Sequence, residues 1–169
     1  MTTDIQGNRL KQVCECKYLC SIFTRDGKME RQIDARLQKA NHMLYQLARL
    51  PEHRTIDIKT KRQLISAIFV PTLCYQCQTW TINKRNERLL TSCEIKCLRK
   101  AADKFRRDRI RNEKIRRIMG VNLVMHHIDK QRVICFAHLM GMPPNQPARI
   151  QHAWERYKVK GAATEKLVR

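Results

Sequence analysis

Cysteine pairs at short spacing are the residues of this chain whose types and separation are best suited to chemistry. Cys74 and Cys77 have two residues between them, and Cys93 and Cys97 have three. Zinc takes about four ligands, commonly supplied as two such pairs. Cys135 with His138 is an alternative second pair. A redox pair of the thioredoxin type instead opens a helix after a strand in a βαβ setting, and no such alternation is predicted here.

The same cysteines also fall where a buried core would need small apolar side chains. Cys93 and Cys97 lie in the apolar stripe of a predicted helix, and unpaired cysteine is among the residue types most often buried. Packing is therefore the favoured interpretation, and no metal or other cofactor is expected in this chain. The alternative is a zinc-dependent DNA-binding module that uses all four thiols. His138 is expected to be a core histidine with its hydrogen bonds satisfied.

The charge of the chain indicates a polyanionic partner. Its 169 residues contain 35 Lys and Arg against 15 Asp and Glu, a net charge of +20. Such a charge opposes compaction by self-repulsion and is typical of proteins that bind nucleic acid. Basic residues are densest in Lys96–Arg117, where eleven accompany only three acidic ones. RNA or DNA is the expected partner, whereas the sequence indicates no oligomeric state.

The N-terminal residues have neither the basic region nor the apolar core of a signal peptide. We therefore expect an intracellular protein, nuclear or cytoplasmic and not secreted, whose cysteines are thiols and not disulfides. The uncharged run 64–83 is long enough to span a bilayer. Its proline, glutamines and threonines would be penalised in hydrocarbon, so it is expected to be a buried segment, and no membrane partner is predicted.

The spacing of apolar residues predicts a mainly α fold, a helical bundle preceded by a short β-hairpin or strand segment. Residues 4–24 are expected to form strands, with a turn at Gly7–Asn8. The run 17–24 is expected to be a single strand, and Cys14 and Cys16 are expected to pack on one face of the strand that contains them. Asn112 and Gly120 are typical of the two ends of a short helix. The expected helices cover residues 28–50, 56–71, 84–102, 113–119 and 123–140. Pro51 is expected to end the first, and Pro71 to kink or break the second.

Four segments of the chain resemble segments of a known protein family. They are "KYLCSIFTRDGKMERQIDARLQKAN", "FVPTLCYQCQTWTINKRNERLLTSCEIKCLRKA", "RDRIRNEKIRRIMGV" and "RVICFAHLMGMP". In uninterrupted order, over about residues 5–145, they are similar to segments of LINE-type (non-LTR) retrotransposon reverse transcriptases. The departures are Cys20 in place of a family Gly, Gln76-Cys77-Gln78 in place of Gly-x-Glu, and Cys135 in place of a Trp. Cys74 stands where the family has Leu.

The resemblance implies a division of the chain and a role for its cations. Residues 1–27 would be the end of the palm, with Tyr18 and Leu19 in a primer-grip-like turn; residues 28–142 would be a helical thumb-like domain, and 143–169 a basic tail. Thumb helices hold a template–primer by backbone contacts, which need cations and not base readout. The residues expected to bind nucleic acid are Lys96, Arg99, Lys100, Lys104, Arg106, Arg107, Arg109 and Arg111.

The resemblance also implies RNA-directed DNA polymerase activity for the intact family enzyme, which uses Mg²⁺ ions held by palm carboxylates. Those carboxylates precede the Tyr-Leu-Gly element, and none of the 15 acidic residues here forms an Asp-Asp pair. We therefore expect a C-terminal fragment without catalytic residues and without an endonuclease domain. It would bind a template–primer but would be inactive alone. An inert retroelement relic is a further alternative.

Overall fold

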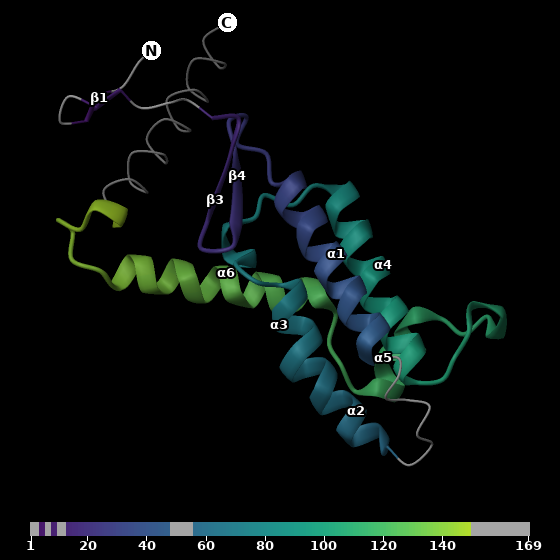
Figure 1. The fold of residues 1–169 in the computed structure, drawn as a ribbon. Coiled ribbons are helices and arrows are strands. Elements are labelled where there is room, and N and C mark those ends of the chain that lie inside the picture. Colours follow the sequence, from purple (N-terminus) through teal and green to yellow (C-terminus); the bar gives the residue numbers. More distant parts are fainter. Residues whose placement is uncertain (1–3, 6–7, 10–12, 48–55, 150–169) are drawn as a thin grey trace, which may run out of the picture. The chain divides into compact units, whose positions relative to one another are not determined.

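The computed structural model describes residues 4–5, 8–9, 13–47 and 56–149. The described chain is mainly helical, with a short antiparallel hairpin of β3 (Glu15–Tyr18) and β4 (Ser21–Thr24) on its N-terminal side (Figure 1). The predicted class, mainly α with a short β segment in front, is confirmed at this level. The chain divides into two units, Met1–Ile128 and Asp129–Arg169, and the core and site described below lie in the first.

The β segment differs in detail from the prediction. β1 (Asp4–Ile5) pairs with β2 (Asn8–Arg9), so Asn8 is a strand residue; Gly7, the other residue of the predicted turn, lies outside the described residues. The single strand predicted over 17–24 is wrong, because the chain reverses between Tyr18 and Ser21. Leu19 and Cys20 have φ values of 45° and 61°, and two successive left-handed residues give the turn that best matches the twist of paired strands.

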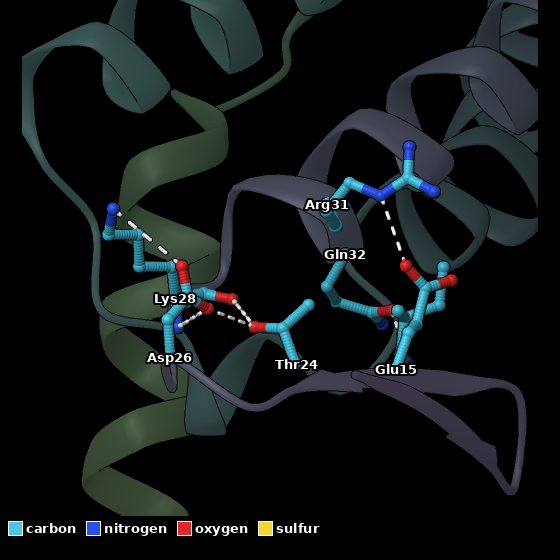
Figure 2. A network of polar contacts seen from close by, with 7 residues as sticks. Glu15, Thr24, Asp26, Lys28, Arg31 and Gln32 are labelled. Atoms are coloured by element: carbon cyan, nitrogen blue, oxygen red, sulfur yellow. Dashed lines mark hydrogen bonds and ion pairs between the residues drawn. The ribbon is translucent and has the colours of Figure 1, made fainter. Parts of the chain in front are cut away.

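Side chains of α1 (Glu30–Leu47) fix the β3–β4 hairpin against the helix (Figure 2). The buried Gln32 accepts a hydrogen bond from the Ile22 backbone N–H at 2.9 Å. Arg31 Nε forms an ion pair with Glu15 at 3.2 Å. The turn after β4 is closed by hydrogen bonds that the Asp26 carboxylate accepts from the Thr24 hydroxyl and the Lys28 N–H. The exposed Cys14 and Cys16 contradict the expectation that they pack.

Pro71 was predicted to kink or break the second helix, and the structure shows no break there. α2 (Ile58–Leu64), the π-helical turn η1 (Ile65–Phe69) and α3 (Val70–Leu73) follow one another without interruption through the proline. Proline lacks an N–H and its ring crowds the carbonyl four residues back. The Val70 N–H bonds to the Ile65 carbonyl five residues back, and this wider turn just before Pro71 accommodates the proline within the helix.

The core forms where α1 packs against α3 and α4 (Lys84–Ala101), and where α4 packs against α5 (Asn112–Met119). The Val124–Ile128 part of α6 (Val124–Gly141) adds to the same cluster. Besides four cysteines, the buried apolar side chains are Ile33, Leu37, Ala40, Leu44, Ile65, Phe69, Leu73, Trp80, Leu90, Leu98, Ile115, Met119, Val124 and Ile128. The helical spacing of Ile33, Leu37, Ala40, Leu44 and Leu47 predicts one apolar face on the first helix, and the first four of these are buried, as that spacing predicts. The same spacing places Arg36 on the opposite face of the helix, yet Arg36 is only 5% exposed.

None of the helices described in the structure combines the length and apolar character needed to cross a lipid bilayer.

Candidate nucleic-acid interface

The four central cysteines are core residues, and burial disfavours ionisation of the thiols of Cys74, Cys93 and Cys97. Cys74, Cys77, Cys93 and Cys97 are all buried. Burial raises the pKa of Cys93 to about 11 and that of Cys97 to about 12. A hydrogen bond with Cys77, together with burial, raises the pKa of Cys74 further. Thiolates are the form that binds zinc and attacks disulfides, so these side chains are suited to packing, as predicted.

The remaining candidate metal ligands, Cys135 and His138, lie on the exposed part of α6. Cys135 and His138 are exposed, so the prediction of a core histidine at position 138 is wrong. Among the residues that the structure describes, no three His, Cys, Asp or Glu side chains are grouped in a way that would hold a metal ion.

Helix α4 carries exposed cations along its length, outside its buried face. It begins at the N-cap Asn83, whose side chain accepts a hydrogen bond from the Asn86 N–H at 2.8 Å. Leu90, Cys93, Cys97 and Leu98 face the core. Lys84 and Arg88 are four residues apart, as are Lys96 and Lys100, so the members of each pair lie on the same side of the helix. All four side chains are exposed.

These cations line an open groove of about 1250 Å³ that continues under the loop after α4. Its basic lining residues are Lys84, Arg88, Lys96, Arg99, Lys100, Lys104 and Arg106. Only two carboxylates, Glu87 and Asp103, share the lining. A groove with this excess of positive charge is suited to a chain of phosphates, which it would contact as point charges and by charge-assisted hydrogen bonds.

The structure brings together most, but not all, of the cations predicted from the sequence. Lys96, Arg99, Lys100, Lys104 and Arg106 line the groove, whereas Arg107, Arg109 and Arg111 are exposed outside its lining. Sequence reasoning missed Lys84 and Arg88. Lys84 and Arg88 are four residues apart, and they precede Lys96 by twelve and eight residues; this spacing in steps of four was the signal that would have found them.

Arg99 positions the loop between α4 and α5 and is not a freely available cation. Its Nη1 donates to the Phe105 carbonyl at 3.3 Å, and its Nη2 donates to Asn112 Oδ1 at 3.0 Å and to the Ile110 carbonyl. Asn112 is the first residue of α5, and Arg111 is its N-cap, one position from the N-cap predicted. One guanidinium therefore closes the loop onto the helices at both of its ends.

The loop itself is an ordered turn that extends away from the end of α4 (Figure 1). It contains the short helix η3 (Arg106–Asp108), and Asp103 and Arg109 have the left-handed φ values of 53° and 52°. Asp108 accepts a hydrogen bond from the Phe105 N–H at 2.7 Å. Lys61 Nζ on α2 pairs with Asp103 at 3.0 Å, which ties the loop to a second helix.

Two exposed aromatic rings lie beside the cations. Tyr45 on α1 is 67% exposed, with the Lys96 and Lys100 ammonium groups 5.9 and 5.5 Å from the centre of its ring. Phe105 in the loop is 61% exposed, with the Arg107 guanidinium carbon 4.8 Å from its ring centre. Rings at these distances attract cations weakly.

Tyr18 and Leu19 lie apart from the groove, at the tip of the β3–β4 hairpin. Both are 65% exposed. The backbone of the tip is fixed by two side chains: Tyr75 Oη donates to the Leu19 carbonyl at 3.3 Å, and Arg36 donates to the Cys20 carbonyl. Arg36 also stacks on the Tyr75 ring, 4.3 Å from its centre. The left-handed φ of Cys20 is a conformation that favours glycine.

A buried carboxylate joins the helices that support the groove. Glu94 on α4 is 3% exposed and accepts hydrogen bonds from Arg116 Nη2 on α5 at 2.9 Å and from the Val124 N–H of α6 at 2.8 Å. Burial raises the pKa of the Glu94 carboxyl, although both hydrogen-bond donors oppose the rise. Glu94 therefore fixes the start of α6 and one face of α5 to the inner side of α4.

Comparisons with family models, with curated proteins and with solved structures find no match to this chain.

Proposed function

We propose that the groove on α4 binds the sugar–phosphate backbone of nucleic acid, and that the chain is the thumb-like part of a LINE-type reverse transcriptase. The observation that carries the proposal is the set of seven cations lining one groove with only two carboxylates. A backbone-binding groove would hold a template–primer without regard to its sequence. The family assignment rests on the sequence motifs alone.

The length of the groove suits this partner. Lys84 and Lys100 are sixteen residues apart on one helix, which corresponds to about 24 Å at the usual helical rise. A duplex carries one phosphate per strand for about every 3.4 Å of its axis, so about seven phosphates of one strand pass along such a length. Several exposed cations can therefore be neutralised at once.

The exposed tip at Tyr18 and Leu19 supports a second part of the proposal. In the family, this turn steadies the primer end, a role that needs a rigid and accessible hairpin. The bonds from Tyr75 and Arg36 hold this tip in place while leaving both side chains exposed. We propose no catalytic residue in this chain, and we propose Mg²⁺ only for the intact family enzyme.

The experiment that tests the groove is a salt titration of binding to a fluorescent duplex, followed by anisotropy. If about five or six phosphates are contacted, log K should fall with log salt at a slope of about −5. Changing Lys96, Lys100 and Lys104 together to Ala should reduce the steepness of that slope by up to about 3, and should weaken binding to all sequences alike.

The matched control changes Lys17, Arg25 and Lys59 together to Ala. It removes the same charge from exposed positions outside the groove lining and should alter the slope by less than about 1. Equal losses in the two triple variants would show that net charge, and not the groove, determines binding. A strong preference for one sequence would contradict backbone recognition. Failure of the wild-type chain to unfold cooperatively would favour the inert-relic alternative.

A further inference from the structure

Phe105 is an aromatic side chain that the fold exposes and yet fixes in place. It is 61% exposed, although burying a phenylalanine side chain contributes roughly 1.5–3 kcal/mol to a fold. Its backbone is held at both ends, because the Phe105 N–H donates to Asp108 and its carbonyl accepts from Arg99. The side chain is thus presented to solvent by a loop whose conformation is already determined.

The surroundings of the ring specify the chemistry of what would cover it. Phe105 is one of the residues lining the basic groove, and its sequence neighbours are Lys104, Arg106 and Arg107. The Arg107 guanidinium lies over the ring at 4.8 Å. An apolar protein segment would satisfy the ring but would leave these cations facing an uncharged partner. A nucleotide satisfies both, because its base has a flat aromatic face and its phosphate is an anion.

We propose that Phe105 is a stacking platform for an unpaired nucleobase at the end of the groove, with Arg107 placed to contact the phosphate of the same nucleotide. In a duplex the flat faces of the bases are covered by their neighbours, so a base must be unstacked before it can lie on the ring. The preferred ligand is therefore a duplex that continues into a single strand, such as a template extending past its primer. This inference rests on the proposed function of the groove.

The test compares a short blunt duplex with the same duplex carrying a single-stranded extension that contains 2-aminopurine, a base whose fluorescence is quenched by stacking. The variants are Phe105→Ala and Phe105→Trp. The matched control is Phe23→Ala, which removes a 50% exposed phenylalanine from β4, outside the groove lining. Thermal melts of all variants should coincide with that of the wild type, because neither side chain is in the core.

The wild type should bind the extended duplex more tightly than the blunt one and should quench 2-aminopurine. Phe105→Ala should lose about 5-fold to about 100-fold in affinity for the extended duplex, the range seen when a stacking aromatic is removed. On the blunt duplex, which offers no unstacked base, it should lose less affinity than on the extended duplex, and its salt slope should equal that of the wild type because no cation is removed. Phe105→Trp should preserve the preference, and Phe23→Ala should change nothing.

Two outcomes overturn the inference in distinguishable ways. If Phe105→Ala binds the extended duplex and quenches its 2-aminopurine like the wild type, the stacking platform is refuted. The groove would still be supported if the Lys96, Lys100 and Lys104 triple variant has a shallower salt slope. If the wild type binds neither duplex, the groove and the platform fail together.

Discussion

Replacing Gly120 by alanine should destabilise the fold by two separable effects. Gly120 ends α5 with a φ of 58°, a left-handed conformation that costs a residue with a Cβ about 1–2 kcal/mol. A Cβ built there would lie 2.6 Å from Arg62 Cζ and 2.6 Å from Arg62 Nη2. The guanidinium must therefore move, although Arg62 Nε donates to the Met119 carbonyl at 2.6 Å.

The second effect is the loss of that hydrogen bond. A hydrogen bond involving a charged group contributes about 1.5–3 kcal/mol, so Gly120→Ala should lower the free energy of unfolding by about 2.5–5 kcal/mol in total. This is a large part of the roughly 5–15 kcal/mol that stabilises a typical domain. Urea denaturation followed by circular dichroism measures the change.

A double-mutant cycle with Arg62→Ala separates the two effects. In the Arg62→Ala background the hydrogen bond is already absent, so Gly120→Ala should cost only the backbone term of about 1–2 kcal/mol. Gly120→Asn is a useful comparison, because asparagine tolerates the left-handed conformation better than alanine but has the same Cβ. If Gly120→Ala costs less than about 0.5 kcal/mol, or if its cost is additive with that of Arg62→Ala, the described contact does not stabilise the fold.

Three further predictions concern other parts of the chain. Since burial raises the pKa of Glu94 above its ordinary value of 4.5, the folded state binds the proton more tightly than the unfolded state. The free energy of unfolding should therefore fall as the pH rises through the window above 4.5. Urea titrations at several pH values should show this fall in the wild type and not in Glu94→Gln; the same dependence of stability on pH in both proteins would refute the prediction. Native protein should react quickly with a thiol reagent at Cys14, Cys16, Cys20 and Cys135, which are exposed, and at the four buried cysteines only after unfolding; rapid labelling of all eight would refute the described core. Purified chain should incorporate no nucleotide on a primed RNA template with Mg²⁺, because no Asp-Asp pair is present; incorporation above a heat-inactivated control would overturn this.

The sequence by itself determined those features that depend on near neighbours along the chain. The period of Ile33, Leu37, Ala40 and Leu44 predicted a helix with one buried face, because hydrophobic burial selects one side of a helix wherever a core exists. Gly120 marked the end of α5 for a similarly local reason, since glycine adopts the left-handed conformation most easily. The excess of cations was equally evident from composition.

Only the tertiary structure decided features that depend on contacts between distant residues. The hairpin turn at Leu19 and Cys20 contains no glycine from which it could have been predicted. The helix continues through Pro71 because the helical turn before the proline is wider than an α-helical turn. Arg36 is buried because its side chain donates a hydrogen bond to the Cys20 carbonyl at the tip of the β3–β4 hairpin. Arg99 looked like one more cation in a basic run, yet its guanidinium closes a loop whose contacts lie up to thirteen residues away. The local sequence pattern indicates which side of a helix or strand is apolar. The hydrogen-bond partner of a long polar side chain depends instead on which backbone groups the fold places within its reach.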